Sequence, residues 1–363
     1  MKVIVLTDHF AQGGAERVAS LITNRLSSID GNEVHVCVFE DTNNYNVLKE
    51  RILFHVLADS KKGYLVNAWL KIYNLSKIMK RVKADVIFSF GPIMNGYVYF
   101  AKKLSGIKKL YVVASERNDP RKEPVEEWKK KVRNFCYNHA DVLVCQTQMA
   151  VDLLREQYGV KTKMVIISNP ITPNLPVWKG VDSKNIIAAC RLTEQKNIPM
   201  MIDAFEKLHK EHPDYRLIIY GEGELRQYLI NIISQKKLQG IVLLPGFTNA
   251  IHEAMQNAYM YVSSSNYEGI SNSMLESMGI GLPVVCTDCP VGGAGMYVKD
   301  GKNGLLTPVG DTESFYLAMK RFIEDKQLAQ TCSENSKAIN RELAVDKIVD
   351  KWLELTAFCP TIE

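Results

Sequence analysis

The stretch EGISNSMLESMGIGLP (residues 268–283) says more about fold and chemistry than any other part of the 363-residue chain. An apolar run at 259–263 precedes it and another at 284–286 follows it, which predicts a strand, a loop, a helix and a second strand. That order is typical of parallel α/β sheets, whose ligands bind beyond the carboxyl ends of the strands. We therefore expect Glu268 to lie at such an end.

The residues after Glu268 predict a helix that begins at a side-chain cap. Ser271 or Asn272 suits the N-cap, because its side-chain oxygen can accept from an unpaired amide of the first turn. Glu268 then lies outside the helix as an exposed carboxylate, beside amides that favour negative charge. Glu276 shares a helix face with Asn272, four residues earlier. This set suits a sugar nucleotide, although a capped surface helix with two solvated glutamates would show the same pattern.

Two glycines are expected to end this helix. Gly279 and Gly281 precede Pro283 and the next apolar run, and glycine is the usual residue just beyond the end of a helix. A buried strand should follow.

A second informative segment is CRLTEQKNIPMMIDAF, residues 190–205. The apolar run at 186–189 predicts a strand, and Arg191 and Lys196 follow it before the next helix. Two cations five residues apart at the end of a strand can clamp a diphosphate, arginine as a planar fork and lysine as a point charge. Together with the two glutamates they predict a phosphate site beside a site for hydroxyls.

Six segments, in their order and spacing, resemble the retaining glycosyltransferases of family 4 (glycosyl transferases group 1). They are GGAER (13–17), RLTEQKN (191–197), YGEGELR (220–226), LPGFTN (244–249), EGISNSMLE (268–276) and DGKNGLL (300–306). The resemblance implies an α/β GT-B fold, in which two Rossmann-like parallel-sheet domains face each other across a cleft. It also implies a nucleotide-sugar donor, no cofactor, no metal, and retention of the anomeric configuration.

The resemblance gives each matched residue a role. The catalytic residues would be Glu268, which holds hydroxyls of the transferred sugar, and Arg191 and Lys196, which neutralise the departing diphosphate. Glu276 would accept hydrogen bonds from the ribose. The other donor-binding residues would be Gly13 and Gly14 near the diphosphate, Phe247 and Thr248 beside the base, and Gly269, Ile270, Ser271 and Asn272 near the sugar and phosphates.

The family has no evident enzymic nucleophile. The mechanism that the resemblance implies is attack of the acceptor on the same face as the leaving group, with a phosphate oxygen taking the acceptor's proton. Catalysis would then consist mostly of positioning and charge stabilisation.

Three residues depart from the family pattern. Cys190 stands where glycine is usual, which would crowd the phosphate clamp, and Met296 stands where an acidic residue is common. Arg117 stands where many relatives have a histidine near the donor sugar. Arg117 and His9 are candidate contacts for the acceptor or the sugar, although His9 suits a capping or packing role equally well.

The distribution of strand-like runs predicts two domains. Six such runs lie in the first half and five in the second, alternating with helical patterns. The segment 168–180 has three prolines and no helical period, as a linker would. We expect an acceptor-binding domain at 1–170, a linker at 171–183, a nucleotide-sugar domain at 184–345, and a last helix at 346–363 that crosses back to the first domain.

Metal, redox and export signals are weak. The chain has no D-x-D triplet, and the Cys286-x-x-Cys289 pair lacks the second pair that a zinc site needs. Scattered cysteines suit a reducing cytoplasm. The first ten residues are too short and polar for a signal peptide, and no run approaches the ~20 apolar residues of a membrane span. We expect a cytoplasmic protein.

Charge is concentrated in the first half of the chain. Residues 1–175 hold 26 basic and 17 acidic residues, whereas residues 176–363 hold 19 and 23. Basic and aromatic residues interleave at 61–83, which suits an anionic membrane at the inner face of the plasma membrane, although a core-facing helix with solvated lysines has the same pattern. No recognised module for nucleic acid accompanies the charge.

The sequence therefore predicts a glycosyltransferase that builds a surface glycan. The expected donor is a UDP-hexose or UDP-N-acetylhexosamine, and the expected acceptor is a lipid-diphosphate-linked glycan, since positive charge suits a pyrophosphate. GDP-mannose is the alternative donor. Other classes stay open, namely a catalytically silent subunit that binds nucleotide or partner proteins, and a sugar phosphorylase or epimerase on the same fold.

Overall fold

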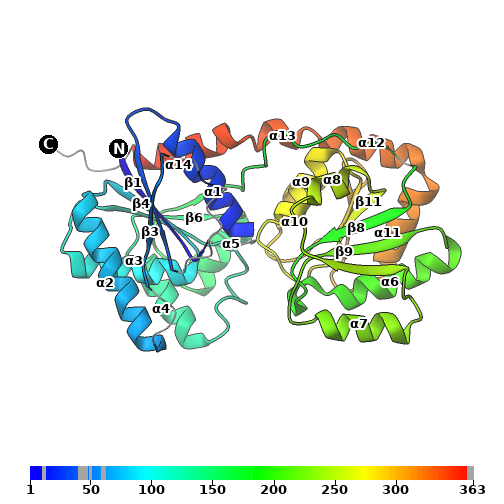
Figure 1. Cartoon of the computed structure of the whole chain (residues 1–363), viewed down its shortest axis with the longest axis horizontal. Coiled ribbons are helices and arrows are strands. Elements are labelled where there is room, and N and C mark those ends of the chain that lie inside the picture. The colour runs from blue at the N-terminus through cyan, green and yellow to red at the C-terminus, as the bar shows by residue number, and fades with distance from the viewer. Residues whose placement is uncertain (10–13, 40–47, 49–50, 59–62, 181, 358–363) are drawn as a thin grey trace. The chain divides into compact units, whose positions relative to one another are not determined.

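The computed structural model describes residues 1–9, 14–39, 48, 51–58, 63–180 and 182–357. It divides into two compact units. Unit 1 contains Met1–Pro170 and Val345–Glu363, and unit 2 contains Ile171–Ala344. Each unit is a parallel sheet with helices on both faces (Figure 1).

Unit 1 has seven parallel strands in the order β3-β2-β1-β4-β5-β6-β7. The strands are β1 (Lys2–Thr7), β2 (Glu33–Val38), β3 (Leu53–Val56), β4 (Val86–Phe90), β5 (Tyr111–Ser115), β6 (Val142–Cys145) and β7 (Met164–Ile166). The helices are α1 (Gly14–Ser27), α2 (Tyr64–Val82), α3 (Pro92–Ser105), α4 (Glu127–Tyr137), α5 (Gln148–Asp152) with the π-helical turn η2 (Leu153–Gln157), and α14 (Val345–Thr356).

Unit 2 has six parallel strands in the order β10-β9-β8-β11-β12-β13. The strands are β8 (Asn185–Ala189), β9 (Arg216–Tyr220), β10 (Val242–Gly246), β11 (Met260–Ser263), β12 (Val284–Thr287) and β13 (Leu305–Thr307). The helices are the 3-10 turn η3 (Glu194–Lys196), α6 (Ile198–Glu211), α7 (Arg226–Gln235), α8 (Ile251–Gln256), α9 (Asn272–Ile280), α10 (Gly293–Tyr297), α11 (Thr312–Glu324), α12 (Lys326–Ser336) and α13 (Ile339–Glu342).

Both sheets have the strand order of a Rossmann fold, which confirms the prediction of two such domains. Their central strands are largely buried, and β4 is buried along its whole length. The order reverses between β1 and β4 in unit 1 and between β8 and β11 in unit 2. Ligands of such sheets bind beyond the carboxyl ends of the strands at the point of reversal. Each unit therefore has one favoured edge for a site.

Two strands were not predicted, and both lie at the edge of a sheet. β3 ends the sheet of unit 1, and β13 ends that of unit 2. β3 has only partly buried or exposed residues, so it lacks the apolar run that marks a central strand. β13 has only three residues and directly follows the polar stretch 300–304, so its apolar run is too short to mark a strand.

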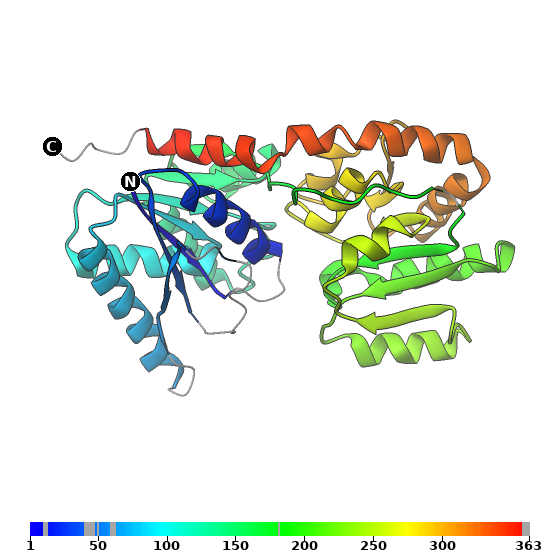
Figure 2. The same ribbon diagram turned by 45° about the horizontal axis from the view of Figure 1, so that its top comes forward.

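The last helix, α14, is part of unit 1 (Figure 2). Its Trp352 is fully buried and contacts Phe88 and Phe90 of β4, with ring centroids 5.4 and 5.3 Å away. Arg25 of α1 forms an ion pair of 2.5 Å with Asp346. The chain therefore leaves unit 1 after Pro170 and returns to it at Val345.

The segment after Pro170 packs within unit 2. Trp178 is buried, and its Nε1 donates to the carbonyl of Ala258 at 2.8 Å. Ile171 is also buried, and its amide donates to the carbonyl of Leu343. Much of the predicted linker is thus a packed segment, held by its aromatic and aliphatic residues.

Helix α9 begins as predicted and ends later. Ser271 is its N-cap and accepts a hydrogen bond from the amide of Met274. The helix runs to Ile280, and Gly281 is its C-cap in the left-handed conformation, so the expectation of a glycine end is confirmed for Gly281 and was wrong for Gly279. Gly279 packs against Ile171 and Asn340, a close approach that favours glycine inside the helix.

None of the described helices is both long enough and apolar enough to cross a bilayer.

Candidate active site

The loops that follow β8 and β11 meet at the reversal point of unit 2. The amide of Asn266 donates to the carbonyl of Gln195 at 2.8 Å, and the Nδ2 of Asn197 donates to the Oδ1 of Asn266 at 3.0 Å. The hydroxyl of Ser264 donates to the carbonyls of Lys196 and Asn197. These bonds fix the Lys196 loop against the loop that leads to Glu268, although the two are more than 60 residues apart in sequence.

Lys196 and Glu268 form an ion pair in which both side chains are 14% exposed. The Oε2 of Glu268 also accepts from the Nε2 of Gln195 at 3.2 Å. The expectation of an exposed Glu268 carboxylate was therefore wrong. A carboxylate this far out of water needs a partner, and Lys196 supplies the opposite charge.

The backbone around Glu268 is held by the loop after β12. The amide of Glu268 donates to the carbonyl of Pro290 at 2.7 Å, and the amide of Val291 donates to the carbonyl of Glu268 at 3.0 Å. Gly293 follows, and a Cβ on it would overlap the carbonyl of Gly269. Glycine at 293 therefore lets the two loops approach each other.

Glu276 lies on the buried face of α9 and is 4% exposed. Its Oε1 accepts from the hydroxyl of Thr172 at 2.6 Å, and its Oε2 lies 2.9 Å from the Nε2 of His252. Because a carboxylate only accepts, His252 donates from Nε2. The carboxylate is thus fixed from two sides by residues that the sequence did not single out.

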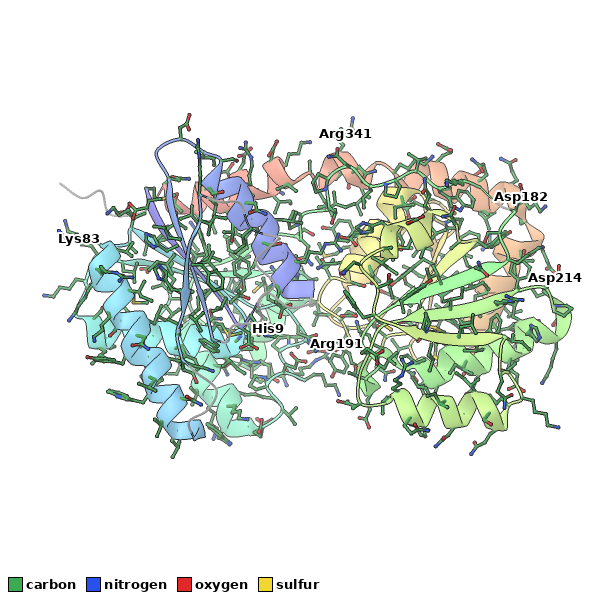
Figure 3. The ribbon with its side chains drawn as sticks, viewed as in Figure 1. His9, Lys83, Asp182, Arg191, Asp214 and Arg341 are labelled. Atoms are coloured by element: carbon green, nitrogen blue, oxygen red, sulfur yellow. The ribbon has the colours of Figure 1, made fainter. Side chains whose placement is uncertain are left out.

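Arg191 follows β8 and is exposed. It lies at the end of unit 2 opposite Asp182 and Asp214, the end at which the strands terminate (Figure 3). The neighbouring Cys190 is partly buried and packs against the core of unit 2, and crowding of the clamp by its side chain stays a prediction. Burial raises the pKa of the Cys190 thiol.

The turn at Phe247 and Thr248 lies at the same edge, directly after β10. Phe247 is exposed, and the hydroxyl of Thr248 accepts from the amide of Ala250, just before α8. Helix α8 carries His252, the partner of Glu276. The segment predicted to border the base is therefore continuous with the segment that fixes Glu276.

The remaining unit 2 candidates surround the start of α9. Gly269, Ile270 and Ser271 precede the helix and Asn272 is its first residue. Ile270 is buried, and Ser271 caps the helix. Unit 2 thus brings ten of the fourteen candidate residues to one sheet edge: Arg191, Lys196, Phe247, Thr248, Glu268, Gly269, Ile270, Ser271, Asn272 and Glu276.

Unit 1 carries the other candidates. Gly13 lies outside the described residues, and Gly14 is the first residue of α1. His9 follows β1, with its Nδ1 3.2 Å from Asp8 and its Nε2 3.9 Å from Glu16. Figure 3 shows His9 far from Lys83, which precedes β4, so His9 lies at the carboxyl edge of the sheet.

Arg117 follows β5 at the same edge of unit 1. Its NH2 donates to the Oδ1 of Asn169 at 2.6 Å, and its guanidinium carbon lies 5.6 Å from the ring centre of Phe90. Its Nε and NH1 atoms are shut off from solvent and have no hydrogen-bond partner among the residues that the structure describes. Burial lowers the pKa of Arg117 to about 10, against an opposing effect of Glu116 and Glu16.

Glu116 anchors the turn that presents Arg117. Its Oε1 accepts from the amides of Arg117 and Asn118 at 2.9 and 3.2 Å, and its Oε2 accepts from the hydroxyl of Tyr137 at 2.9 Å. Burial raises the pKa of Glu116.

Within the described part of the chain, no group of three or more His, Cys, Asp or Glu residues is arranged to hold a metal ion. Cys286 and Cys289, the close pair in the sequence, are both buried free thiols.

Comparison with known proteins identifies two family models. The model for glycosyltransferase family 4 matches residues 12–175, and the model for glycosyl transferases group 1 matches residues 178–339. One relative is the N-acetylgalactosamine-N,N'-diacetylbacillosaminyl-diphospho-undecaprenol 4-alpha-N-acetylgalactosaminyltransferase of Campylobacter jejuni, 28% identical over 353 residues and 93% of each chain. Another is the poly(ribitol-phosphate) alpha-N-acetylglucosaminyltransferase of Staphylococcus aureus, 25% identical over 82% of this chain and 60% of that protein.

Solved structures show the same fold. HepE of Anabaena, in complex with UDP and glucose, has a TM-score of 0.86 and 20% identity, and the match covers 98% of this chain and 99% of that one. TarM has a TM-score of 0.82 and 15% identity, with 98% of each chain covered. The predicted GT-B class is confirmed.

Proposed function

This chain belongs to glycosyltransferase family 4, and we propose that it transfers a hexose or N-acetylhexosamine from a UDP-sugar to a lipid-diphosphate-linked glycan, with retention. The observation that carries the proposal is the meeting of Lys196, Glu268 and Glu276 with Arg191 at one edge of unit 2. The UDP donor is supported by the UDP in the HepE complex, and the lipid-linked acceptor by the name of the Campylobacter relative.

The diphosphate is held by the two cations. Arg191 is exposed at the end of β8, and Lys196 is fixed in the following turn. A diphosphate that reaches this edge competes with Glu268 for the ammonium of Lys196. Donor binding thereby weakens the ion pair, and Glu268 becomes available to the hydroxyls of the sugar.

Glu276 holds the ribose. A carboxylate has about four acceptor positions, so it can accept from ribose hydroxyls in addition to Thr172 and His252. Because these two residues fix its orientation before the nucleotide arrives, little side-chain entropy is lost on binding.

The transfer itself exchanges one bond for another. The bond between the anomeric carbon and the phosphate oxygen breaks, and the acceptor oxygen forms a bond to the same face of that carbon. The proton of the acceptor hydroxyl passes to the departing phosphate oxygen. Arg191 and Lys196 offset the charge that develops there, and we propose that they do so without a metal.

We further propose that unit 1 lies on the cytoplasmic face of an anionic membrane. Its helices α2, α3 and α4 expose large apolar side chains beside many lysines. The most exposed are Leu65 (79%), Trp69 (57%), Ile93 (61%) and Trp128 (62%). The apolar side chains in the second half of α2 are nevertheless buried in the core of unit 1, so the exposed apolar residues of this helix lie in its first half. Such a surface suits the boundary between headgroups and acyl chains.

The proposed transfer is tested by mixing the protein with candidate donors and a prenyl diphosphate-linked sugar, and by measuring product mass and anomeric configuration. UDP-glucose, UDP-N-acetylglucosamine, UDP-N-acetylgalactosamine and GDP-mannose are the donors. An α-linked product from a UDP-sugar supports the proposal. A product from GDP-mannose alone would replace the donor, and no product from any donor would favour a silent subunit.

A further inference from the structure

Two histidines join the outer strands of the unit 1 sheet through their rings. The Nδ1 of His35 in β2 lies 3.0 Å from the Nε2 of His55 in β3, and the ring planes are 11° from parallel. The Nε2 of His35 lies 2.8 Å from the Oε1 of Glu33. His35 is 4% exposed, and His55 is half-buried. We refer to His35 and His55 as the histidine pair.

These contacts limit how much charge the histidine pair can hold. A carboxylate only accepts hydrogen bonds, so His35 donates to Glu33 from Nε2. One hydrogen lies between the two rings, because one of the facing nitrogens must donate and the other must accept. If both rings were charged, both facing nitrogens would carry a hydrogen and the bond between them would break. The intact pair therefore holds at most one positive charge.

Charged groups of two neighbouring elements act on the pair. Lys2 of β1 lies 3.6 Å from Glu33 and shares this carboxylate with His35. Arg81, in the last turn of α2, adds positive charge near His55. Burial lowers the pKa of His55, and the charges of His35 and Arg81 lower it further. A second charge on the pair is thus opposed by burial and by the cations around it.

The lowered pKa sets the sign of the pH dependence. The histidines of an unfolded chain take up protons at about pH 6.5, whereas folded His55 resists protonation to a lower pH. The stability that the uncharged His55 supplies is therefore present above about pH 6.5 and is lost as the pH falls through the pKa of the folded state. Cys37, two residues after His35 on the same face of β2, stays neutral throughout, because burial raises the pKa of its thiol to about 12.

Strand β3 depends on this contact because it ends the sheet. Among the described strands it pairs with β2 alone, and its residues are only partly buried or exposed. Helix α2 in turn contacts the end of β3, since the Nδ2 of Asn74 donates to the carbonyl of Leu57 at 2.6 Å. Segments with few buried contacts open at a lower cost than the core. Loss of the bond between the rings should therefore loosen β3 and its contact with α2.

We propose that the histidine pair is a proton-sensitive latch on the edge of unit 1. At neutral pH the shared hydrogen joins β2 to β3. At acid pH, proton uptake from solvent charges both rings, breaks the bond between them and places two cations beside Arg81. β3 then loosens together with the support of α2, the helix that exposes Leu65 and Trp69. This inference goes beyond the proposed transfer and does not rest on it.

Hydrogen exchange of the full chain at about pH 7.5 and about pH 5.5 tests the latch. After correction for the intrinsic effect of pH on exchange, the amides of β3 should exchange about tenfold or more faster at the lower pH, since like charges in contact disfavour the closed state. The amides of α2 around Asn74 should show a change in the same direction.

Two pairs of variants separate the latch from other effects of pH. His55→Gln keeps a donor and an acceptor in the side chain but cannot be charged, so it should remove most of the acceleration. His139→Gln is its control, because His139 is an exposed histidine of the same unit, bonded to the carbonyl of Phe135. Arg81→Gln should reduce the acceleration, whereas Lys80→Gln, in the same turn of α2, should leave it unchanged.

Equal protection of β3 in the wild type at both pH values, or an equal acceleration in the wild type and His55→Gln, would overturn the inference. NMR titration of the wild-type histidine rings provides a test that needs no variant. Charging of both His35 and His55 should coincide with the loss of protection in β3. Two charged rings beside a β3 that stays protected would also contradict the latch.

Discussion

The charged side chains at the carboxyl edge of the sheet are partnered differently in the two units. In unit 2 the charged side chains are paired before any ligand arrives, as Lys196 is with Glu268 and Glu276 is with His252. In unit 1 the corresponding edge holds Arg117, whose Nε and NH1 have no acceptor within the described part of the chain. The difference teaches that the charged side chains of unit 2 are held by partners within the unit, whereas a neutral amide, Asn169, holds Arg117 in unit 1.

The largest effect on the rate of transfer is expected when the positive charge of Lys196 in unit 2 is removed. Lys196→Ala should lower the rate of transfer by about a hundredfold or more, because one electrostatic contact to a developing anion is commonly worth that much. The rate is measured with saturating donor. Lys207→Ala is the control, since Lys207 forms an exposed pair with Glu313 in the same unit. Equal rates in the two variants would remove Lys196 from the phosphate site.

The next effect comes from the close approach of two loops. Gly293→Ala would place a methyl group against the carbonyl of Gly269, and overpacking of this kind costs about 1–3 kcal/mol. We expect a lower free energy of unfolding and weaker nucleotide binding, measured by denaturant titration and calorimetry. Gly96→Ala, inside α3 with open space around it, should instead be stabilising by about 0.5–1 kcal/mol. A Gly293→Ala variant as stable as the wild type would show that the loops are not fixed.

A smaller effect should follow from the support of Glu276. His252→Leu removes one donor from a buried carboxylate, so UDP affinity should fall about tenfold while the rate at saturation changes little. This split between affinity and rate distinguishes positioning from catalysis. His209→Leu, in the same unit and bonded only weakly to Tyr215 at 3.3 Å, is the matched control and should bind UDP normally.

The smallest effect is expected at the exposed apolar face of unit 1. Leu65→Ser should weaken binding to vesicles of phosphatidylglycerol in phosphatidylcholine severalfold, because it removes one of several apolar side chains that enter the boundary between headgroups and acyl chains. Leu317→Ser, which removes an exposed leucine from unit 2, should have no effect. Flotation of both variants measures the difference. Equal binding of both would contradict the membrane role of α2.

Much of the fold and of the candidate site could be predicted from local sequence, and some of the site could not. The apolar runs of β8 and β9 and the cap at Ser271 are local signals, and they predicted the fold and the position of Glu268. The prediction that the Glu268 carboxylate is exposed was wrong, because its partner Lys196 lies 72 residues earlier in the chain. A pattern within one segment contains no information about such a partner.

The residues that contact the two glutamates but were not predicted also differ in how far a local pattern marks them. Gln195 stands inside the motif RLTEQKN and could have been noticed as a polar residue between the two cations. Thr172 lies 104 residues from Glu276, and no local pattern marks it. His252 follows the turn predicted to border the base, but only the packing of α8 against α9 brings it to the carboxylate.

The most direct test of the preorganised donor site is the thermal stability of the wild type and of Glu276→Ala with UDP, GDP, ADP and CMP. A ligand at 100 times its dissociation constant adds about 2.7 kcal/mol, which raises the midpoint by a few degrees in domains of this size. Glu211→Ala is the control, because Glu211 is a surface partner of Lys320. We predict a shift of the wild type and the control with UDP that Glu276→Ala loses. An equal shift in Glu276→Ala, or no shift of the wild type with any nucleotide, would contradict the assignment.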